Sequence, residues 1–236
     1  MGDAVYLRQL KAGRDFGLGN PVATMMENFV YLVGDAARRE CLVVDPAWDV
    51  EGIVQVAEAE GYTITGALVS HWHPDHVGGS MMGHDVEGLA RLLAVHPVPV
   101  HVHRADAELV RAMTGLSASD LVLHDSGDKV AAGDVEVECL HTPGHTQGSQ
   151  CFRCGKALIS GDTLFLSGCG RTDLPGGDVE EMWRTLTTRL LTLPRDLILY
   201  PGHDYGSKPH ASLGEVARTN PILQAPSLET FLQMRG

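Results

Sequence analysis

Four residues that can bind a metal ion lie within six positions of the segment His71-Trp72-His73-Pro74-Asp75-His76. This segment directly follows residues 64–70, an apolar run that predicts a strand. His71 and His73 are two residues apart, so on an extended backbone both imidazoles point to one side, and Pro74 then turns the chain. Imidazoles and carboxylates crowded into one loop lose solvation unless a cation joins them. The segment therefore predicts a metal site at the carboxyl end of a strand, where α/β proteins place their chemistry.

Three later segments repeat this pattern of a strand followed by a ligand residue close to glycine. Glycine allows the backbone to approach closely or to adopt a positive φ at such a point. The segments are 140–146, 158–163 and 199–205, and they supply His145, Asp162 and His203. We expect these three side chains to complete the coordination of the ions held by the first segment.

The order of the apolar runs predicts an α/β fold with a mixed sheet covered by helices, because local pairing gives way to alternation of strands and helices. A hairpin signal at 34–37 makes the first two predicted strands antiparallel. The predicted strands are 29–33, 41–44, 64–70, 98–102, 135–140, 157–160 and 197–200, and helical spacing predicts helices within 50–57, 89–93, 107–113 and 182–193. No linker composition divides the chain, so we expect one domain over residues 1–236.

Charge and hydropathy narrow the possible partners. The 18 Lys and Arg against 30 Asp and Glu give a formal net charge of −12, which disfavours nucleic acid and anionic membrane surfaces as partners. No apolar stretch is long enough to span a bilayer. The segment 1–8 carries an acid where an export signal would be positive, and no apolar region follows it before Lys11. We therefore expect a cytoplasmic protein.

The five cysteines are an odd number and suit a reducing compartment better than a disulfide framework. Cys151 and Cys154 lie three residues apart in a predicted strand, so their side chains should point to opposite faces and cannot share one metal ion. We expect both thiols to be packed in the core.

The ligand pattern resembles that of the metallo-beta-lactamase superfamily, whose motif is His-x-His-x-Asp-His followed by single His, Asp and His residues on later strand ends. All seven positions are matched in order, and the resemblance extends over nearly the whole chain. It implies a four-layer αβ/βα sandwich with the metals in a cleft at one sheet edge. The matched residues are His71, His73, Asp75, His76, His145, Asp162 and His203.

The resemblance also implies a role for each of these residues. His71, His73 and His145 would hold one metal ion, and Asp75, His76 and His203 would hold a second. Asp162 would bridge the two ions, and Asp75 and Asp162 are the catalytic candidates through this ligation. The implied cofactors are two divalent ions, with zinc expected first and iron or manganese as alternatives.

Within the superfamily, residues 168–174 (Gly-Cys-Gly-Arg-Thr-Asp-Leu) and 201–206 are similar to the glyoxalase II group and to the persulfide dioxygenases. The first group implies hydrolysis of a thioester such as S-lactoylglutathione by a hydroxide that bridges two zinc ions. The second implies a single Fe(II), held by His71, His145 and Asp162, that uses O₂ and glutathione persulfide. A lactonase or another hydrolase of this fold is a further alternative. Thioester hydrolysis is our first expectation, and the shared ligand residues leave the alternatives open.

A glutathione conjugate carries carboxylates, so a cation should lie beside the metals. The cationic candidates for substrate binding are Arg171, Lys208 and Arg218, with Tyr205 as a hydroxyl donor. Arg171 is also spaced to pair with Asp173. The expected partner is a small molecule, glutathione or another thiol conjugate, and association into a homo-oligomer is left open.

Two further expectations concern residues around the ligands. His141 precedes His145 by four residues and could orient it. Only 33 residues follow His203 in the 236-residue chain, so we expect no separate C-terminal helical domain of the kind that binds glutathione in longer glyoxalase II enzymes.

Overall fold

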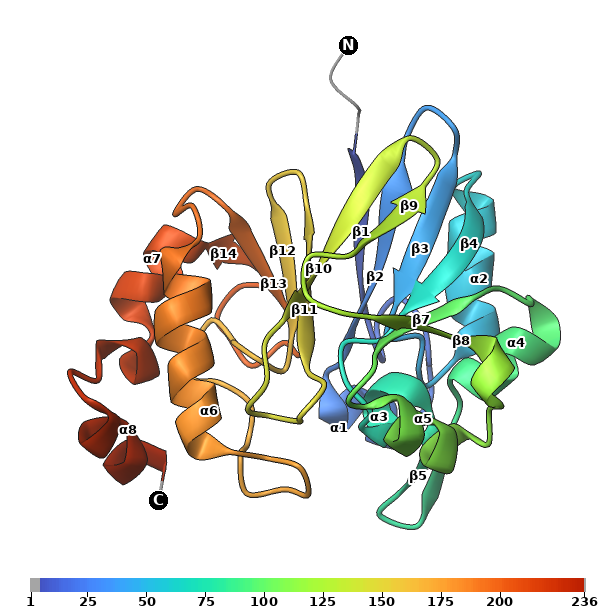
Figure 1. Cartoon of the computed structure of the whole chain (residues 1–236). Helices are drawn as coiled ribbons and strands as arrows, with labels where there is room; N and C mark the ends of the chain where they lie inside the picture. Colours follow the sequence, from blue (N-terminus) through green and yellow to red (C-terminus); the bar gives the residue numbers. More distant parts are fainter. Residues whose placement is uncertain (1–4, 236) are drawn as a thin grey trace.

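Two six-stranded sheets face each other in the computed structural model, which describes residues 5–235 (Figure 1). Residues 1–4, part of the segment searched for an export signal, lie outside the described residues. The first sheet has the order β1 (Val5–Lys11), β2 (Phe29–Asp35), β3 (Glu40–Val44), β4 (Thr63–Leu68), β7 (Val100–His103) and β8 (Leu121–His124). The second has the order β14 (Ala211–Ser212), β13 (Ile198–Pro201), β12 (Ala157–Gly161), β11 (Gln150–Cys154), β10 (Val135–His141) and β9 (Lys129–Ala132).

Helices cover the outer face of each sheet. The first sheet carries α2 (Val50–Ala59), α4 (Leu89–Val95) and α5 (Ala107–Thr114), and the second carries α6 (Val179–Arg184), α7 (Leu213–Thr219) and α8 (Leu228–Arg235). At the edge of the sheets lie α1 (Pro21–Met26), α3 (Pro74–Val77) and a hairpin of β5 (Gly79–Met81) and β6 (His84–Val86) (Figure 1).

Alternation along the strands explains these layers. In β2, Phe29 and Tyr31 belong to the core between the two sheets, whereas Val30 and Leu32 belong to the core beneath the first set of helices. A strand buried on both faces reads as a continuous apolar run, and these are the strands that the sequence predicts most clearly. The result is the expected four-layer αβ/βα sandwich.

All seven predicted strands are present, with their ends shifted by a few residues. The hairpin at 34–37 joins β2 and β3 in antiparallel register, as expected. The expected separation of two cysteines is also confirmed, because Cys151 lies in the core under the second set of helices and Cys154 between the sheets. The predicted helix within 182–193 is only partly α-helical, since α6 ends at Arg184 and π-helical and 3₁₀ turns follow.

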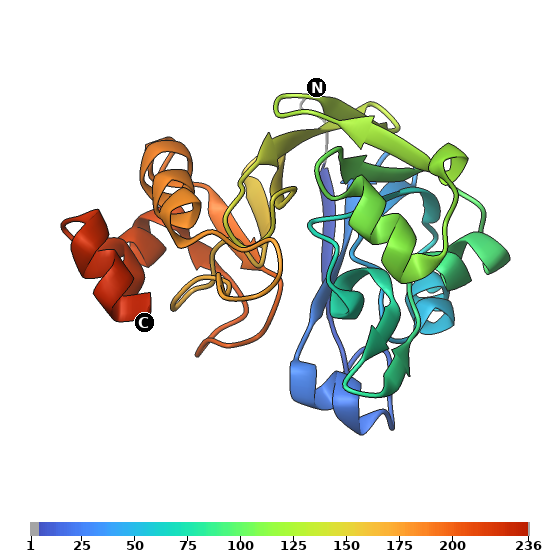
Figure 2. The same cartoon turned by 60° about the horizontal axis from the view of Figure 1, so that its bottom comes forward.

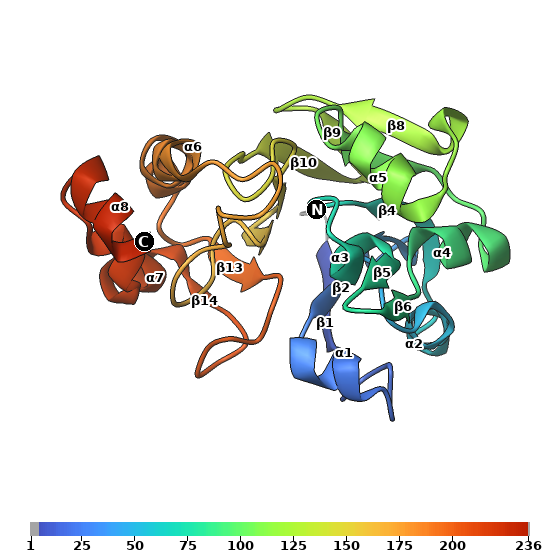
Figure 3. The same cartoon turned by 90° about the horizontal axis from the view of Figure 1, so that it is seen from below.

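The segments that follow β4, β10, β12 and β13 gather at one edge of the sandwich. Seen from below, α1, α3 and the β5–β6 hairpin lie on the first-sheet side and face the long loops of the second sheet (Figures 2 and 3). This edge therefore receives side chains from both sheets. Within residues 5–235, no helix has the length and apolar character needed to cross a membrane.

Candidate metal centre

Seven side chains with ligand atoms meet at this edge. They form three overlapping groups, and in each group the ligand atoms lie within 4.8 Å of one another. The groups are His71, His73 and His145; His71, His76 and Asp162; and Asp75, His76 and His203. The structure thus brings together every residue of the seven-position motif, and all of these His and Asp groups are able to bind metal.

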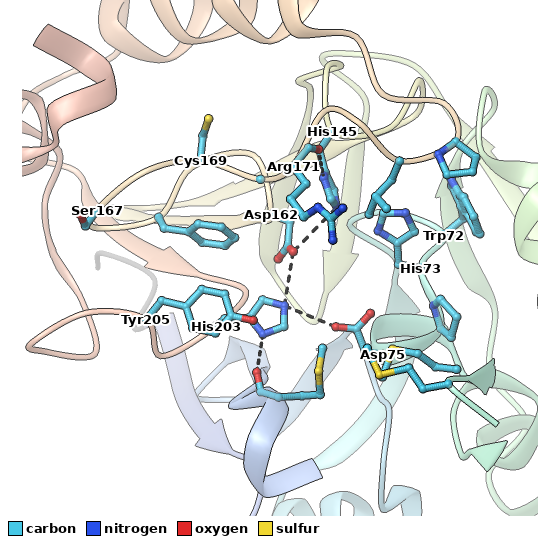
Figure 4. Close-up of a pocket in the computed structure, with 18 residues that line it drawn as sticks. Trp72, His73, Asp75, His145, Asp162, Ser167, Cys169, Arg171, His203 and Tyr205 are labelled. Carbon is cyan, nitrogen blue, oxygen red and sulfur yellow. Dashed lines mark hydrogen bonds and ion pairs between the residues drawn. The ribbon is translucent and has the colours of Figure 1, made fainter. Parts of the chain in front are cut away.

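The Asp162 carboxylate lies between the two sets of histidines. Its Oδ1 is 3.5 Å from Nε2 of His76, and its Oδ2 is 3.3 Å from Nε2 of His203. Oδ2 is also 3.8 Å from Nε2 of His145. Figure 4 shows Asp162 between His145 and His203, with Asp75 below. One carboxylate therefore contacts residues of both predicted ion sites.

Four of the imidazoles are oriented by a hydrogen bond at Nδ1. His145 donates to the carbonyl of Arg171 at 2.6 Å, and His203 donates to the carbonyl of Met26 at 2.7 Å. Such a partner fixes the tautomer and leaves Nε2 as the ligand atom. The other two bonds join His71 to the Ser70 hydroxyl at 3.0 Å and His76 to the Asp45 carboxylate at 2.9 Å.

Asp45 connects two of the ligand residues, and our sequence reasoning missed it. Its Oδ2 accepts from His76 and from the Ser70 hydroxyl at 2.5 Å, and that hydroxyl in turn contacts His71. Its Oδ1 accepts from the Ser70 backbone at 2.7 Å. Asp45 directly follows the apolar residues of β3, as the metal ligands follow their strands. It has no neighbouring glycine, unlike His145, Asp162 and His203, and this is why the pattern did not single it out.

Asn28 also supports the site, and no local pattern marks it. Its amide donates to Asp75 Oδ2 at 3.1 Å and lies 3.4 Å from His76 Nε2. Its carbonyl oxygen accepts from the indole of Trp48 at 2.9 Å. These contacts hold the Asp75 carboxylate in place beside His76.

Burial and mutual charge shift the protonation of the ligands. Burial lowers the pKa of His71 well below its usual value, and burial together with His145 lowers the pKa of His73 to about 4. Burial opposes ionisation of Asp162, but the charges of His203 and His76 outweigh it and hold the pKa of Asp162 well below its usual range. Near neutral pH His71 and His73 are neutral imidazoles and Asp162 is a carboxylate, the forms that metal ions require.

Burial opposes the charge on His76 and His203, but the nearby carboxylates of Asp75 and Asp162 outweigh it, raising the pKa of His76 to about 10 and that of His203 above its usual value. A metal ion that binds these two histidines must therefore displace a proton from each.

The hydrogen-bonding state of the ligand atoms gives separate support for a metal ion. Among the buried side-chain atoms without a hydrogen-bond partner are His71 Nε2, His145 Nε2 and Asp162 Oδ1. Leaving buried polar atoms unsatisfied costs about 1–3 kcal/mol each. A cation that accepts electron pairs from these atoms removes this cost, so the residues present fit a metal centre.

A cavity of about 650 Å³ opens beside the cluster, and the substrate-binding candidates differ in their relation to it. Arg171 and Tyr205 line the cavity. Arg171 pairs with Asp173 through contacts of 2.9 and 2.6 Å. Lys208 does not line the cavity and instead forms a 2.6 Å ion pair with Glu215.

The expectation that His141 orients His145 is wrong. His141 Nε2 contacts the carbonyl of Gln147 at 2.8 Å, and its ring stacks on His103. The orienting partner of His145 is the Arg171 carbonyl, which a side-chain pattern cannot reveal.

A family model described as the metallo-beta-lactamase superfamily matches residues 24–203. The chain belongs to this superfamily. Members of the superfamily are metal-dependent enzymes, either hydrolases or dioxygenases. The ligand cluster described above lies wholly within the matched range.

Similar proteins of this superfamily include both kinds of enzyme. A hydroxyacylglutathione hydrolase of Polaromonas sp. is 38% identical over 181 residues, which cover 75% of this chain and 62% of the relative. The human mitochondrial persulfide dioxygenase ETHE1 is 31% identical over 211 residues, which cover 88% of this chain and 76% of the relative. The crystal structure of ETHE1 from Myxococcus xanthus aligns with a TM-score of 0.77 at 28% identity, covering 98% of this chain and 89% of that chain.

Proposed function

We propose that this chain is a thioester hydrolase of the hydroxyacylglutathione hydrolase type. It binds two divalent ions in this proposal, and zinc is the metal that we expect. One observation carries the proposal. The Asp162 carboxylate lies 3.3–3.8 Å from histidines of both ligand sets, which suits a bridge between two ions better than the ligand of a single ion. The similarity to a hydroxyacylglutathione hydrolase at 38% identity supports the same reaction class.

In this proposal the ligands divide as the family motif implies. His71, His73 and His145 would hold one ion, and Asp75, His76 and His203 would hold the other. Asp162 would be shared by the two sets, so Asp75 and Asp162 would be the catalytic carboxylates through their ligation. Two bound divalent ions would supply a water that ionises near neutral pH and a Lewis acid toward a carbonyl oxygen.

The protein's own contribution is orientation and protonation state. The Nδ1 partners of the histidines keep each Nε2 directed at the cluster. The low pKa of Asp162 keeps its carboxylate ionised. Arg171 and Tyr205 line the cavity and would contact the thiol carrier of the substrate.

A second candidate is a mononuclear iron persulfide dioxygenase, and one specific observation favours it. The unsatisfied buried atoms of the cluster belong to His71, His145 and Asp162, which by themselves form a two-histidine, one-carboxylate set. The second ligand set is partly satisfied by protein, because Asn28 contacts both Asp75 and His76. The similarity to ETHE1 supports this reading as well.

Metal content and oxygen consumption distinguish the two candidates. We expect about two equivalents of zinc per chain and turnover of S-lactoylglutathione without O₂ uptake. One iron per chain with rapid O₂ uptake on glutathione persulfide would instead identify the dioxygenase.

A substitution in the second ligand set gives an independent check. His76→Ala should remove most hydrolase activity and one of the two metal equivalents, since His76 belongs only to the second set and its junction with Asp162. A mononuclear iron enzyme would keep its metal and most of its rate. His84→Ala, at an exposed histidine outside the cluster, is the matched control.

A further inference from the structure

We propose that the cavity beside the metal centre selects thioesters whose acyl group is an apolar chain rather than a small hydroxyacyl group. This inference rests on the proposed thioester hydrolysis and adds the chemistry of the acyl group to it. The two walls of the cavity differ in the polar side chains that they carry outside the ligand set.

The wall on the first-sheet side is apolar and rich in methionine. Met26 ends α1, and Met81 and Met82 form the tip of the β5–β6 hairpin, with Trp72 beside them on the lining. Methionine adapts to irregular apolar ligands because its side chain is unbranched and polarisable. Met82 is 77% exposed although it lines the cavity, so its apolar surface is left for a ligand to cover.

The wall on the second-sheet side includes the apolar residues Phe165, Leu174 and Pro175, and it also carries polar groups outside the ligand set. Ser167, Arg171 and Tyr205 lie there, and Figure 4 shows Ser167 and Tyr205 across the ligand cluster from Trp72. The amides of a thiol carrier need hydrogen-bond partners, which this wall can offer. The carrier therefore fits over the polar part of the second-sheet wall, and the acyl group is placed against the methionine wall.

Charge contributes little to recognition in this cavity. Among the lining residues, Arg171 is the one Lys or Arg, and its guanidinium is held by the Asp173 carboxylate. Lys11 contacts Asp204, next to the ligand His203, but it also pairs with Glu27. Anionic groups of a substrate thus meet no uncompensated cation among these residues, and discrimination falls to the apolar wall.

A hydroxyl on the acyl group finds no strong hydrogen-bond partner among the three methionines of the first-sheet wall. The thioethers of Met26, Met81 and Met82 are weak acceptors and donate no hydrogen bond. An alkyl chain buries apolar surface against the methionines instead. Each buried methylene raises the binding constant about fourfold. The cavity volume of about 650 Å³ is large enough for a chain of several carbons.

The test uses the zinc-loaded full chain and a series of glutathione thioesters with lactoyl, acetyl, butanoyl and hexanoyl groups. We expect kcat/KM to rise by about fourfold per methylene from acetyl to hexanoyl and to be higher for hexanoyl than for lactoyl. A flat series, or lactoyl as the fastest substrate, would overturn the inference.

Binding of inert thioethers separates this inference from the proposed function. S-Hexylglutathione has five more methylenes than S-methylglutathione and should bind the same zinc-loaded protein more tightly by about fourfold for each, or about a thousandfold, in calorimetry. If no thioester is hydrolysed, the proposed function fails, and this binding difference still supports an apolar wall. Equal binding of the two thioethers refutes the apolar wall whatever the turnover.

Matched methionine variants locate the effect. Met82→Gln should lower the ratio of kcat/KM for hexanoyl over acetyl by about three- to tenfold, because an amide replaces part of the apolar wall. Met25→Gln changes a methionine on α1 that is 62% exposed and does not line the cavity. It should keep the wild-type ratio, and an equal loss of the ratio in both variants would contradict the assignment of Met82.

Discussion

The orienting partners of the ligand histidines differ in whether a substitution can remove them. His145 and His203 donate to backbone carbonyls, which persist whatever side chain is present. His76 donates to the carboxylate of Asp45, which a substitution can change without moving the backbone. Asp45 is therefore the residue through which the orientation of a ligand can be tested.

Asp45→Asn should weaken metal binding by about 10- to 100-fold, the usual effect of removing an orienting partner behind a ligand. The asparagine oxygen can still accept from the Ser70 backbone, but its NH₂ group then faces His76 Nδ1 and the Ser70 hydroxyl, which both need an acceptor. Competition with a chelator of known affinity measures the change.

A matched carboxylate serves as the control for Asp45. Asp35 is also buried, and it accepts backbone hydrogen bonds from Ala37, Arg38 and Asp134 at the far end of the strands. Asp35→Asn should lower stability and leave metal affinity at the wild-type value. Wild-type metal affinity in Asp45→Asn would show that His76 needs no orienting carboxylate.

The residues that could be predicted from the sequence are those with a repeating local pattern. The seven motif residues each follow a strand, and all seven lie in segments marked by glycine or proline. Asn28 carries no such mark, because its amide reaches Asp75 only after the chain has brought β2 beside α3. Its role depends on tertiary position, which one sequence does not encode locally.

At the scale of elements, prediction succeeded for strands buried on both faces and failed for edge elements. The buried apolar runs 29–33 of β2 and 41–44 of β3 are predicted correctly. β1 lies at the sheet edge, is largely part-exposed and has polar residues at 8, 9 and 11 that interrupt its apolar run, so the sequence does not predict it. The four-residue helix α3 was likewise missed, since Pro74 at its first position reads equally as a turn.

Two histidines of β7 join neighbouring elements and give stability a pH dependence. His101 Nδ1 lies 2.8 Å from His124 Nε2 on β8, and the ring of His103 stacks at 3.8 Å on that of His141 on β10. Burial, reinforced by His124, lowers the pKa of His101 to about 4, and burial with His141 does the same for His103. Both imidazoles are therefore neutral in the folded protein near pH 7.

The sign of the effect follows from these shifts. The unfolded chain takes up protons on His101 near pH 6.5, whereas the folded chain resists them down to about pH 4, so the free energy of unfolding falls as the pH drops through this window. Between about pH 7 and pH 5 the free energy of unfolding should fall in both proteins, but by about 1–2 kcal/mol less in His101→Asn than in the wild type. Urea unfolding at the two pH values measures this difference. The exposed His84→Asn should follow the wild type, and parallel curves for all three proteins would contradict the assignment.

At the scale of the whole molecule, the metal centre joins the two halves of the sandwich. The four residues 71, 73, 75 and 76 follow a strand of the first sheet, and His145, Asp162 and His203 follow strands of the second. The apolar pattern alone predicted a mixed sheet covered by helices but not its division into two sheets. Strands such as β2 and β12 are buried on both faces, so hydropathy cannot assign them to different sheets.

Because the site is built from both sheets, bound metal should stabilise the entire fold. An ion that binds the folded chain alone at a thousand times its Kd adds about 4 kcal/mol to the free energy of unfolding. For a chain of this length, that corresponds to about 8–16 °C in Tm. We therefore expect a chelator to lower Tm by this amount in calorimetry and added zinc to restore it.

Asp162→Asn loses the carboxylate shared by the ligand sets, so its Tm should respond much less to the chelator. An unchanged Tm of the wild type after complete metal removal would show that the two halves are held together by the apolar core between the sheets without help from the ions.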